Sequence, residues 1–100
     1  MQDFPDDWDL KTKIEYLQRK IILCSIAYYM LSESIISDKA YDEISYQLVR
    51  MHTEYGDISD TQYGYVMYDF DGTTGFDLYG RLNDHDKTYL LNIARHVAHK

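Results

Sequence analysis

The sequence predicts a mainly α-helical α+β protein: an antiparallel helical hairpin, a small β-hairpin and a C-terminal helix. Two long segments carry apolar residues at every third or fourth position, which is the spacing of one helix face. In a later segment, large side chains recur at every second position, which is the spacing of one face of a strand. The 100 residues leave room for one modest core. We therefore expect a single domain, residues 1–100, that begins with an acidic arm at residues 1–8.

The helical hairpin is expected at residues 9–56. Asp9 is a suitable N-cap for its first helix. Ile22 and Ile26 widen the apolar stripe of this helix, which predicts that it packs against other elements on two sides. The stripe itself extends over about six turns and comprises Leu10, Ile14, Leu17, Ile21, Cys24, Tyr28 and Leu31.

The short connection at residues 32–36 favours an antiparallel arrangement of the two helices. Ser37 then provides an N-cap for the second helix, and Asp38 lies where the helix dipole favours negative charge. Gly56 is the expected stop at the C-terminal end. The apolar stripe of the second helix, which should face the first, comprises Tyr41, Ile44, Leu48, Met51 and Tyr55.

Residues 57–82 change to a strand-like period. Large side chains at positions 63, 65 and 67 alternate with their neighbours, and a second such run, residues 76–79, follows the glycine-containing stretch 70–75. This pattern predicts a β-hairpin. An isolated two-stranded ribbon is marginal in water, so its aromatic side should lie on the helices.

The last element, residues 83–100, is expected to be a helix. Asn83 or Asp84 can cap its start, and Arg95 near its end has the charge that the helix dipole favours there. We expect this helix to complete the core through an apolar face of Leu90, Ile93, Ala94 and Val97.

The chain is acidic, with a net charge of −7 and a pI near 4.8. No lysine or arginine lies between Arg50 and Arg81. This argues against direct nucleic-acid binding, which depends on Lys and Arg neutralising phosphates. We expect a protein partner with a basic surface, although acidic loops that only keep the protein soluble are an open alternative. The candidate partner-binding residues are Glu54, Asp57, Asp60, Asp69, Asp71 and Asp77.

Several classes of protein do not fit the sequence. The single cysteine, Cys24, allows no internal disulfide. The N-terminal segment is acidic where a signal peptide would be basic, and no apolar run approaches the ~20 residues of a membrane span. We therefore expect a cytoplasmic protein without membrane association. No histidine spacing predicts a metal site, and no glycine-rich phosphate loop or Ser/His/Asp arrangement predicts a catalytic site.

One group of residues around the expected hairpin loop has the chemistry of a ligand site. Tyr28 and Tyr29 end the first helix, while Asp38, Tyr41 and Asp42 lie in the first turns of the second. Aromatic faces stack on a pyridinium ring, and carboxylates attract its positive charge and bind ribose hydroxyls. The same residues would also stabilise a ligand-free helical hairpin, and this alternative stays open.

Residues 27–42 resemble the N-terminal helical hairpin, domain Ia, of bacterial NAD-dependent DNA ligases. The likeness runs without gaps, and Tyr28, Tyr29, Asp38, Tyr41 and Asp42 fall on motif positions of that family, which has His or Tyr at the position of Tyr29. The resemblance implies that these five residues hold the nicotinamide mononucleotide half of NAD. Residues 59–62, Ser-Asp-Thr-Gln, resemble the Ser-Pro-Thr-Gln of the ligases more weakly.

A DNA ligase needs further domains, including the one that holds the adenylate half of NAD, and 100 residues have no room for them. We therefore expect a non-enzymatic, stand-alone, ligase-related module of bacterial, phage or mobile-element origin. It would require no cofactor, and would bind nicotinamide mononucleotide or NAD, or dock on a nucleotide-using enzyme. The alternative is an acidic inhibitor or adaptor of the anti-CRISPR or anti-restriction type, encoded by a phage or mobile element. A third possibility is a subunit of a separately encoded ligase.

Overall fold

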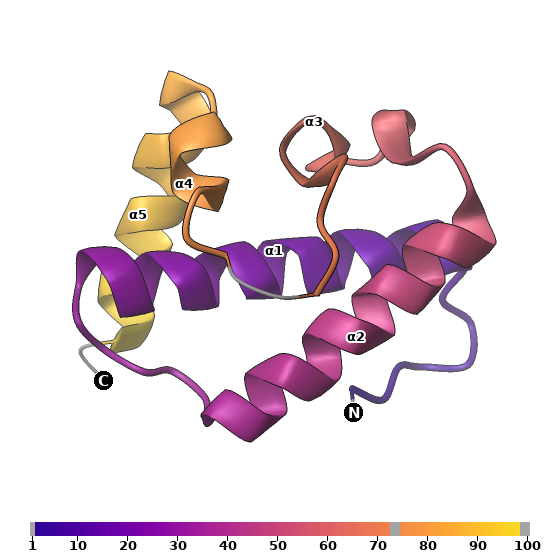
Figure 1. The fold of residues 1–100 in the computed structure, drawn as a ribbon, viewed down its shortest axis with the longest axis horizontal. Coiled ribbons are helices and arrows are strands. Elements are labelled where there is room, and N and C mark those ends of the chain that lie inside the picture. The colour runs from indigo at the N-terminus through magenta and orange to yellow at the C-terminus, as the bar shows by residue number, and fades with distance from the viewer. Residues whose placement is uncertain (1, 73–74, 99–100) are drawn as a thin grey trace.

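A long first helix organises the fold. The computed structural model describes residues 2–72 and 75–98, and in it α2 (Asp38–Tyr55), α4 (Leu78–Arg81) and α5 (Asp84–Ala98) all pack against α1 (Leu10–Met30) (Figure 1). Asp9 caps α1 as predicted, because its carboxylate accepts a hydrogen bond of 2.8 Å from the amide of Thr12. Ile21 and Ile22 point in different directions on a helix, and both are fully buried. The prediction that this helix packs on two sides is therefore confirmed.

The antiparallel helical hairpin is also confirmed. The two long helices run in opposite directions and cross at an angle (Figure 1). Ser37 caps α2 by accepting a hydrogen bond of 3.1 Å from the amide of Ala40. Gly56 ends α2 with a φ of +94°, a conformation that glycine adopts without the steric penalty of a side chain.

The predicted β-hairpin at residues 57–82 is wrong. The described part of this segment contains no strand, and forms instead a 3-10 turn, η1 (Ile58–Asp60), and two short helices, α3 (Gly64–Met67) and α4. Tyr63, Val66 and Met67 are the buried members, at the i, i+3, i+4 spacing of a helix. A short apolar run fits either period, and burial in the core selects the helical one. Residues 73–74, within the expected β-turn, lie outside the described residues.

The segment around α3 lies directly against η1. A Cβ atom at Gly64 would overlap the carbonyl oxygen of Ile58 and lie 2.9 Å from the hydroxyl of Thr61. Only glycine permits this approach without movement of the backbone. The close approach brings Tyr63 and Val66 fully into the core.

A buried polar network joins α1 to the chain that follows α2. Gln18 has no exposed surface. Its Nε2 donates to Thr61 Oγ1 at 2.9 Å, and its Oε1 accepts from the backbone amide of Tyr63 at 3.2 Å. The Nε2 atom of His52 lies 3.3 Å from Gln18 Nε2, and burial lowers the pKa of this histidine to about 4. The network fixes where the chain re-enters the core after α2.

The final helix begins where the sequence predicts. Asn83 caps α5, with its side chain accepting a hydrogen bond of 2.7 Å from a backbone amide in the first turn. Leu90 and Ala94 of the predicted apolar face are fully buried, whereas Val97 is 36% exposed. Residues 99 and 100, at the expected end of this helix, lie outside the described residues.

The N-terminal arm is held on the helices. The ring of Phe4 packs 5.7 Å from Trp8 and 5.8 Å from Tyr16. The side chain of Gln47 on α2 bonds both the amide and the carbonyl of Gln2, each at 2.9 Å. Two helices therefore fix the described part of the arm, residues 2–8; Met1 lies outside it.

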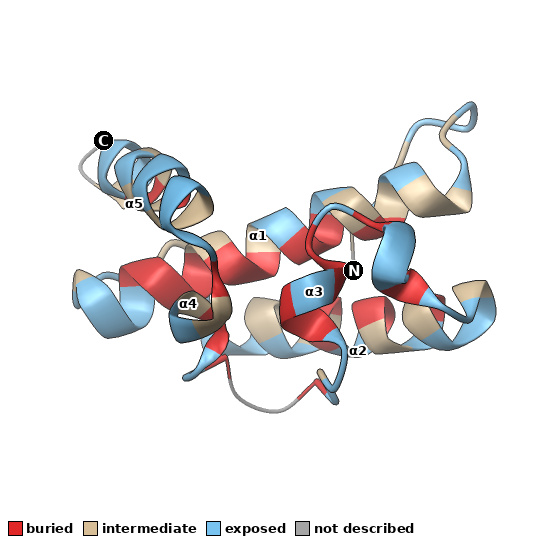
Figure 2. Cartoon of the chain, turned by 90° about the horizontal axis from the view of Figure 1, so that it is seen from above, coloured by how far each residue is buried: buried red, intermediate tan, exposed pale blue. Residues whose placement is uncertain are grey.

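The core is centred on α1, and Figure 2 shows its buried residues along this helix and around α3, while α5 is exposed on its outer side. The radius of gyration, 12.9 Å, is close to the ~13 Å expected of a globular chain of this length. Among residues 2–72 and 75–98, no helix is both long and apolar enough to cross a membrane.

Candidate ligand-binding site

The five residues that the sequence suggested for ligand binding line one pocket. The pocket has a volume of about 360 Å³ and lies between the last turns of α1 and the first turns of α2. Tyr28 and Tyr29 enter it from α1, and Asp38, Tyr41 and Asp42 enter it from α2. Small-molecule sites typically have volumes of ~300–1,000 Å³, so the pocket is large enough for a small ligand. The remaining lining residues are Cys24, Ser25, Ser34, Ile35, Ile36 and Gly75.

The loop between the helices brings the two groups together. Ser32 has a φ of 55°, in the left-handed region, and this conformation ends α1 and turns the chain. The amides of Leu31 and Glu33 both bond the carbonyl of Ala27, which secures the turn. No residue pattern indicates this conformation in advance, because serine rarely adopts it.

The floor of the pocket is polar and partly buried. The hydroxyl of Tyr41 lies 3.3 Å from Ser25 Oγ, which donates to the carbonyl of Ile21 at 3.0 Å. Burial raises the pKa of Tyr41, so its phenol is neutral at physiological pH. Burial also raises the pKa of Cys24 to about 11, which keeps this residue a protonated thiol. These groups offer hydrogen bonds to a ligand and no strong nucleophile.

Gly75 closes one side of the pocket and was not expected from the sequence. A Cβ atom at this position would overlap Ser25 Oγ and lie 2.7 Å from the hydroxyl of Tyr41. The chain can therefore reach the pocket wall at this point only because residue 75 is glycine. The C-terminal half of the chain thus contributes to a pocket that the sequence placed wholly on the helical hairpin.

Exposed aromatic rings surround the mouth of the pocket. The rings of Tyr28 and Tyr29 are 5.0 Å apart at 81°, and those of Tyr29 and Phe76 are 5.3 Å apart at 90°. The exposed fractions are 54% for Tyr28, 43% for Tyr29 and 71% for Phe76. Tyr28 was expected in the buried stripe of α1, and this expectation is wrong. Phe76 was not expected in the site at all, and no pattern in the sequence indicates it.

The carboxylates of Asp38 and Asp42 lie at the solvent-exposed edge of the pocket. Both are at the start of α2, where the helix dipole stabilises negative charge. Their position is therefore explained equally well by stabilisation of the helix start without a ligand and by a role in ligand binding. Their exposure means that solvent screens their attraction for a cation.

Two of the six acidic residues expected to face a basic partner are paired with an arginine of the same chain. Arg81 donates to Asp69 at 2.5 Å and to Asp77 at 2.8 Å. The hydrogen bond from Arg81 lowers the pKa of Asp69. The first basic residue beyond the acidic segment thus folds back to neutralise part of it.

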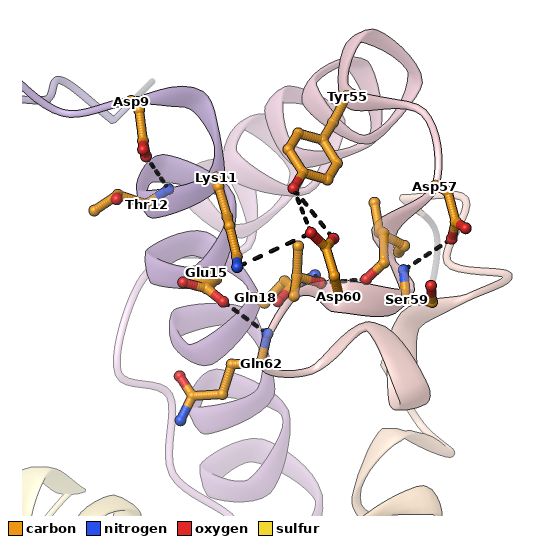
Figure 3. Close-up of polar contacts among 12 residues, drawn as sticks. Asp9, Lys11, Thr12, Glu15, Gln18, Tyr55, Asp57, Ser59, Asp60 and Gln62 are labelled. Carbon is orange, nitrogen blue, oxygen red and sulfur yellow. Dashed lines mark hydrogen bonds and ion pairs between the residues drawn. The ribbon is translucent and has the colours of Figure 1, made fainter.

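Two further acidic residues have roles around η1 (Figure 3). Asp57 caps η1 by accepting a hydrogen bond of 3.0 Å from the amide of Ser59. Asp60 accepts a hydrogen bond of 2.9 Å from the hydroxyl of Tyr55 and lies 4.0 Å from Lys11 Nζ. Asp57, Asp60, Asp69 and Asp77 are therefore engaged within the chain. Glu54 and Asp71 are also exposed.

The chain is weakly similar to a DNA ligase. Over 50 residues, 50% of its own length, it is 34% identical to a DNA ligase of Pseudothermotoga lettingae, and it spans 7% of the length of that ligase. No protein-family model matches the chain, and no solved structure matches it. The similarity covers too little of the ligase to extend the activity of that enzyme to this chain.

Proposed function

We propose that this protein is a non-enzymatic binding module, resembling domain Ia of DNA ligases, whose pocket holds nicotinamide mononucleotide or that half of NAD. The observation that supports this proposal most is the meeting of five residues from two separate helices around one pocket. The partial similarity to a DNA ligase also supports it.

The lining of the pocket suits a positively charged aromatic ring on a sugar. The rings of Tyr28 and Tyr29 are exposed at the mouth and offer faces to a pyridinium, an interaction of about 0.5–2 kcal/mol. Asp38 and Asp42 offer carboxylates to the positive charge and to ribose hydroxyls. Tyr41 adds a neutral hydroxyl at the floor.

The size and exposure of the pocket set the expected affinity. A volume of about 360 Å³ suits one nucleotide more closely than a dinucleotide. The charged groups are exposed, so each contributes little to the affinity. We expect dissociation constants of about 0.1–1 mM, with similar values for nicotinamide mononucleotide and NAD, because a pocket of this volume holds only one of the two nucleotides of NAD.

Titration calorimetry and ligand-observed NMR test the proposal. Nicotinamide mononucleotide should bind more tightly than its reduced form, whose dihydropyridine ring is neutral. Asp42→Asn should weaken binding, whereas Glu54→Gln, which removes an exposed charge outside the pocket, should not. Asp38→Ala should also weaken binding, and Tyr41→Ala, which removes the ring and hydroxyl at the floor, should abolish the signal. If millimolar nicotinamide mononucleotide gives no signal with the folded protein, the proposal is wrong.

No observation favours the acidic inhibitor as a second function. In that hypothesis, residues 51–80, which include no lysine or arginine, present their acidic side chains to a basic enzyme. Asp57, Asp60, Asp69 and Asp77 are instead engaged within the chain.

A further inference from the structure

A second cavity runs along the outer face of α1. It has a volume of about 470 Å³ and lies between the N-terminal arm, which supplies Trp8, and α5, which supplies Val97. We call it the α1 groove. Its floor is one face of α1, formed by Thr12, Glu15, Tyr16, Arg19, Lys20 and Leu23. The α1 groove adjoins the ligand pocket, because Cys24 and Ile35 line both.

The charge of the α1 groove is opposite to that of the protein as a whole. The chain has a net charge of −7 and ten lysines and arginines. Four of these cations, Lys11, Lys13, Arg19 and Lys20, lie within one stretch of ten residues at the start of α1, together with a single acid, Glu15. Arg19 and Lys20 line the α1 groove. An acidic segment is therefore attracted to this face and repelled by most of the remaining surface.

The apolar groups of the α1 groove lie at two points along it. Tyr16, 41% exposed, lies toward the N-terminal end, and Leu23, partly buried, lies toward the other end beside Val97. Tyr16 and Leu23 are seven residues apart on α1, a separation of about 10 Å along the axis. Arg19 and Lys20 lie between them on the same face. Along its length the α1 groove therefore offers an aromatic contact, then two cations, then an aliphatic contact.

From this arrangement we propose that the α1 groove binds an acidic amphipathic helix of a protein partner. The partner helix carries two large apolar side chains seven residues apart, one for each apolar point. Aspartate or glutamate lies between them, opposite Arg19 and Lys20. This is recognition of a helix in a groove, in which apolar anchors supply affinity and charge supplies selectivity. The proposal is independent of any ligand in the pocket between α1 and α2.

Trp8 provides a reporter at the site, because it is the one tryptophan of the chain and lines the α1 groove. The probes are two blocked helical peptides with leucines at positions four and eleven. One has glutamates between the leucines on the same face, and the other has lysines at those positions. The glutamate peptide should bind, change the fluorescence of Trp8 and shift the NMR signals of Tyr16 and Leu23, and its affinity should fall as salt is added.

Two charge reversals complete the test. Arg19→Glu should lower the affinity for the glutamate peptide about tenfold, because an attraction becomes a repulsion. Lys39→Glu makes the same change of charge at an exposed position outside the α1 groove and should leave binding unchanged. Equal binding of both peptides, equal effects of the two reversals, or no binding by the folded protein would overturn the proposal. Self-association of the protein through the α1 groove, seen by sedimentation and abolished by Arg19→Glu, would overturn it in favour of a second copy.

Discussion

Replacement of Gln18 by methionine should destabilise the protein, although it puts an apolar side chain of similar size in a fully buried position. Gln18 accepts a hydrogen bond from the amide of Tyr63 and donates one to Thr61. Methionine can do neither. The backbone amide of Tyr63 would then be buried without an acceptor, because Tyr63 itself has no exposed surface.

The magnitude follows from three opposing effects. A buried amide without a partner costs about 1–3 kcal/mol. The loss of the Gln18 amide group also affects Thr61 and His52. Thr61 keeps its hydrogen bond of 2.6 Å to Ile58, and the partly exposed His52 can bond water, so these two residues add only about 0.5–1 kcal/mol to the cost. The methionine regains about 1 kcal/mol through apolar burial. The free energy of unfolding should therefore fall by about 2 kcal/mol, which for a chain of this size lowers the melting temperature by about 10 °C.

Urea unfolding followed by circular dichroism measures this difference, and Gln47→Met is the matched control. Gln47 is also nearly buried, at 8% exposed, but its two hydrogen bonds go to the backbone of Gln2 in the N-terminal arm. The arm can turn to water when these bonds are lost, so the control should cost less than about 1 kcal/mol. If Gln18→Met is neutral or stabilising, or if the two variants are equal, the reasoning on the buried amide is refuted.

Three further predictions concern other buried groups. Burial in the folded protein lowers the pKa of His52 from 6.5 to about 4, so between these pH values the unfolded chain binds one proton more than the folded chain. The free energy of unfolding should therefore fall as the pH drops through this interval, and His52→Gln should flatten the dependence of the urea midpoint on pH. Gly75→Ala places a methyl group against Ser25 and Tyr41, so it should lower stability by about 1–3 kcal/mol in urea unfolding, and unchanged stability would contradict the packing. The hydroxyl of Tyr63 is buried without a hydrogen-bond partner among the described residues. Tyr63→Phe should therefore raise the free energy of unfolding by about 1 kcal/mol, and with it the melting temperature. A lower melting temperature would show that the hydroxyl has a partner.

The helices that the sequence predicted correctly are those with long periodic patterns and defined ends. Asp9, Ser37 and Asn83 each accept the capping hydrogen bond expected of them, and Gly56 has the positive φ expected of a helix stop. These signals are local, since a cap and its acceptor lie within one turn. The elements within residues 57–82 have only three or four residues each, too few for a periodic pattern, and their period was assigned wrongly.

The candidate site was predicted only in the part that lies near the hairpin loop. Asp38, Tyr41 and Asp42 share the first turns of one helix, so their proximity follows from helix geometry. Gly75 and Phe76 come from a distant part of the chain. Their place at the pocket depends on how the segment after α3 packs across α1 and α2, which no local pattern encodes.

The amino-acid sequence alone determined the two long helices, their caps, the direction of the hairpin and the group of tyrosines and aspartates at its loop, because these depend on interactions between residues close in the chain. Only the tertiary structure decided the helical form of residues 57–82, the pairing of Arg81 with Asp69 and Asp77, the buried bonds of Gln18 and the α1 groove. Each of these depends on which distant segments exclude water from one another, and burial of that kind overrides weak local preferences.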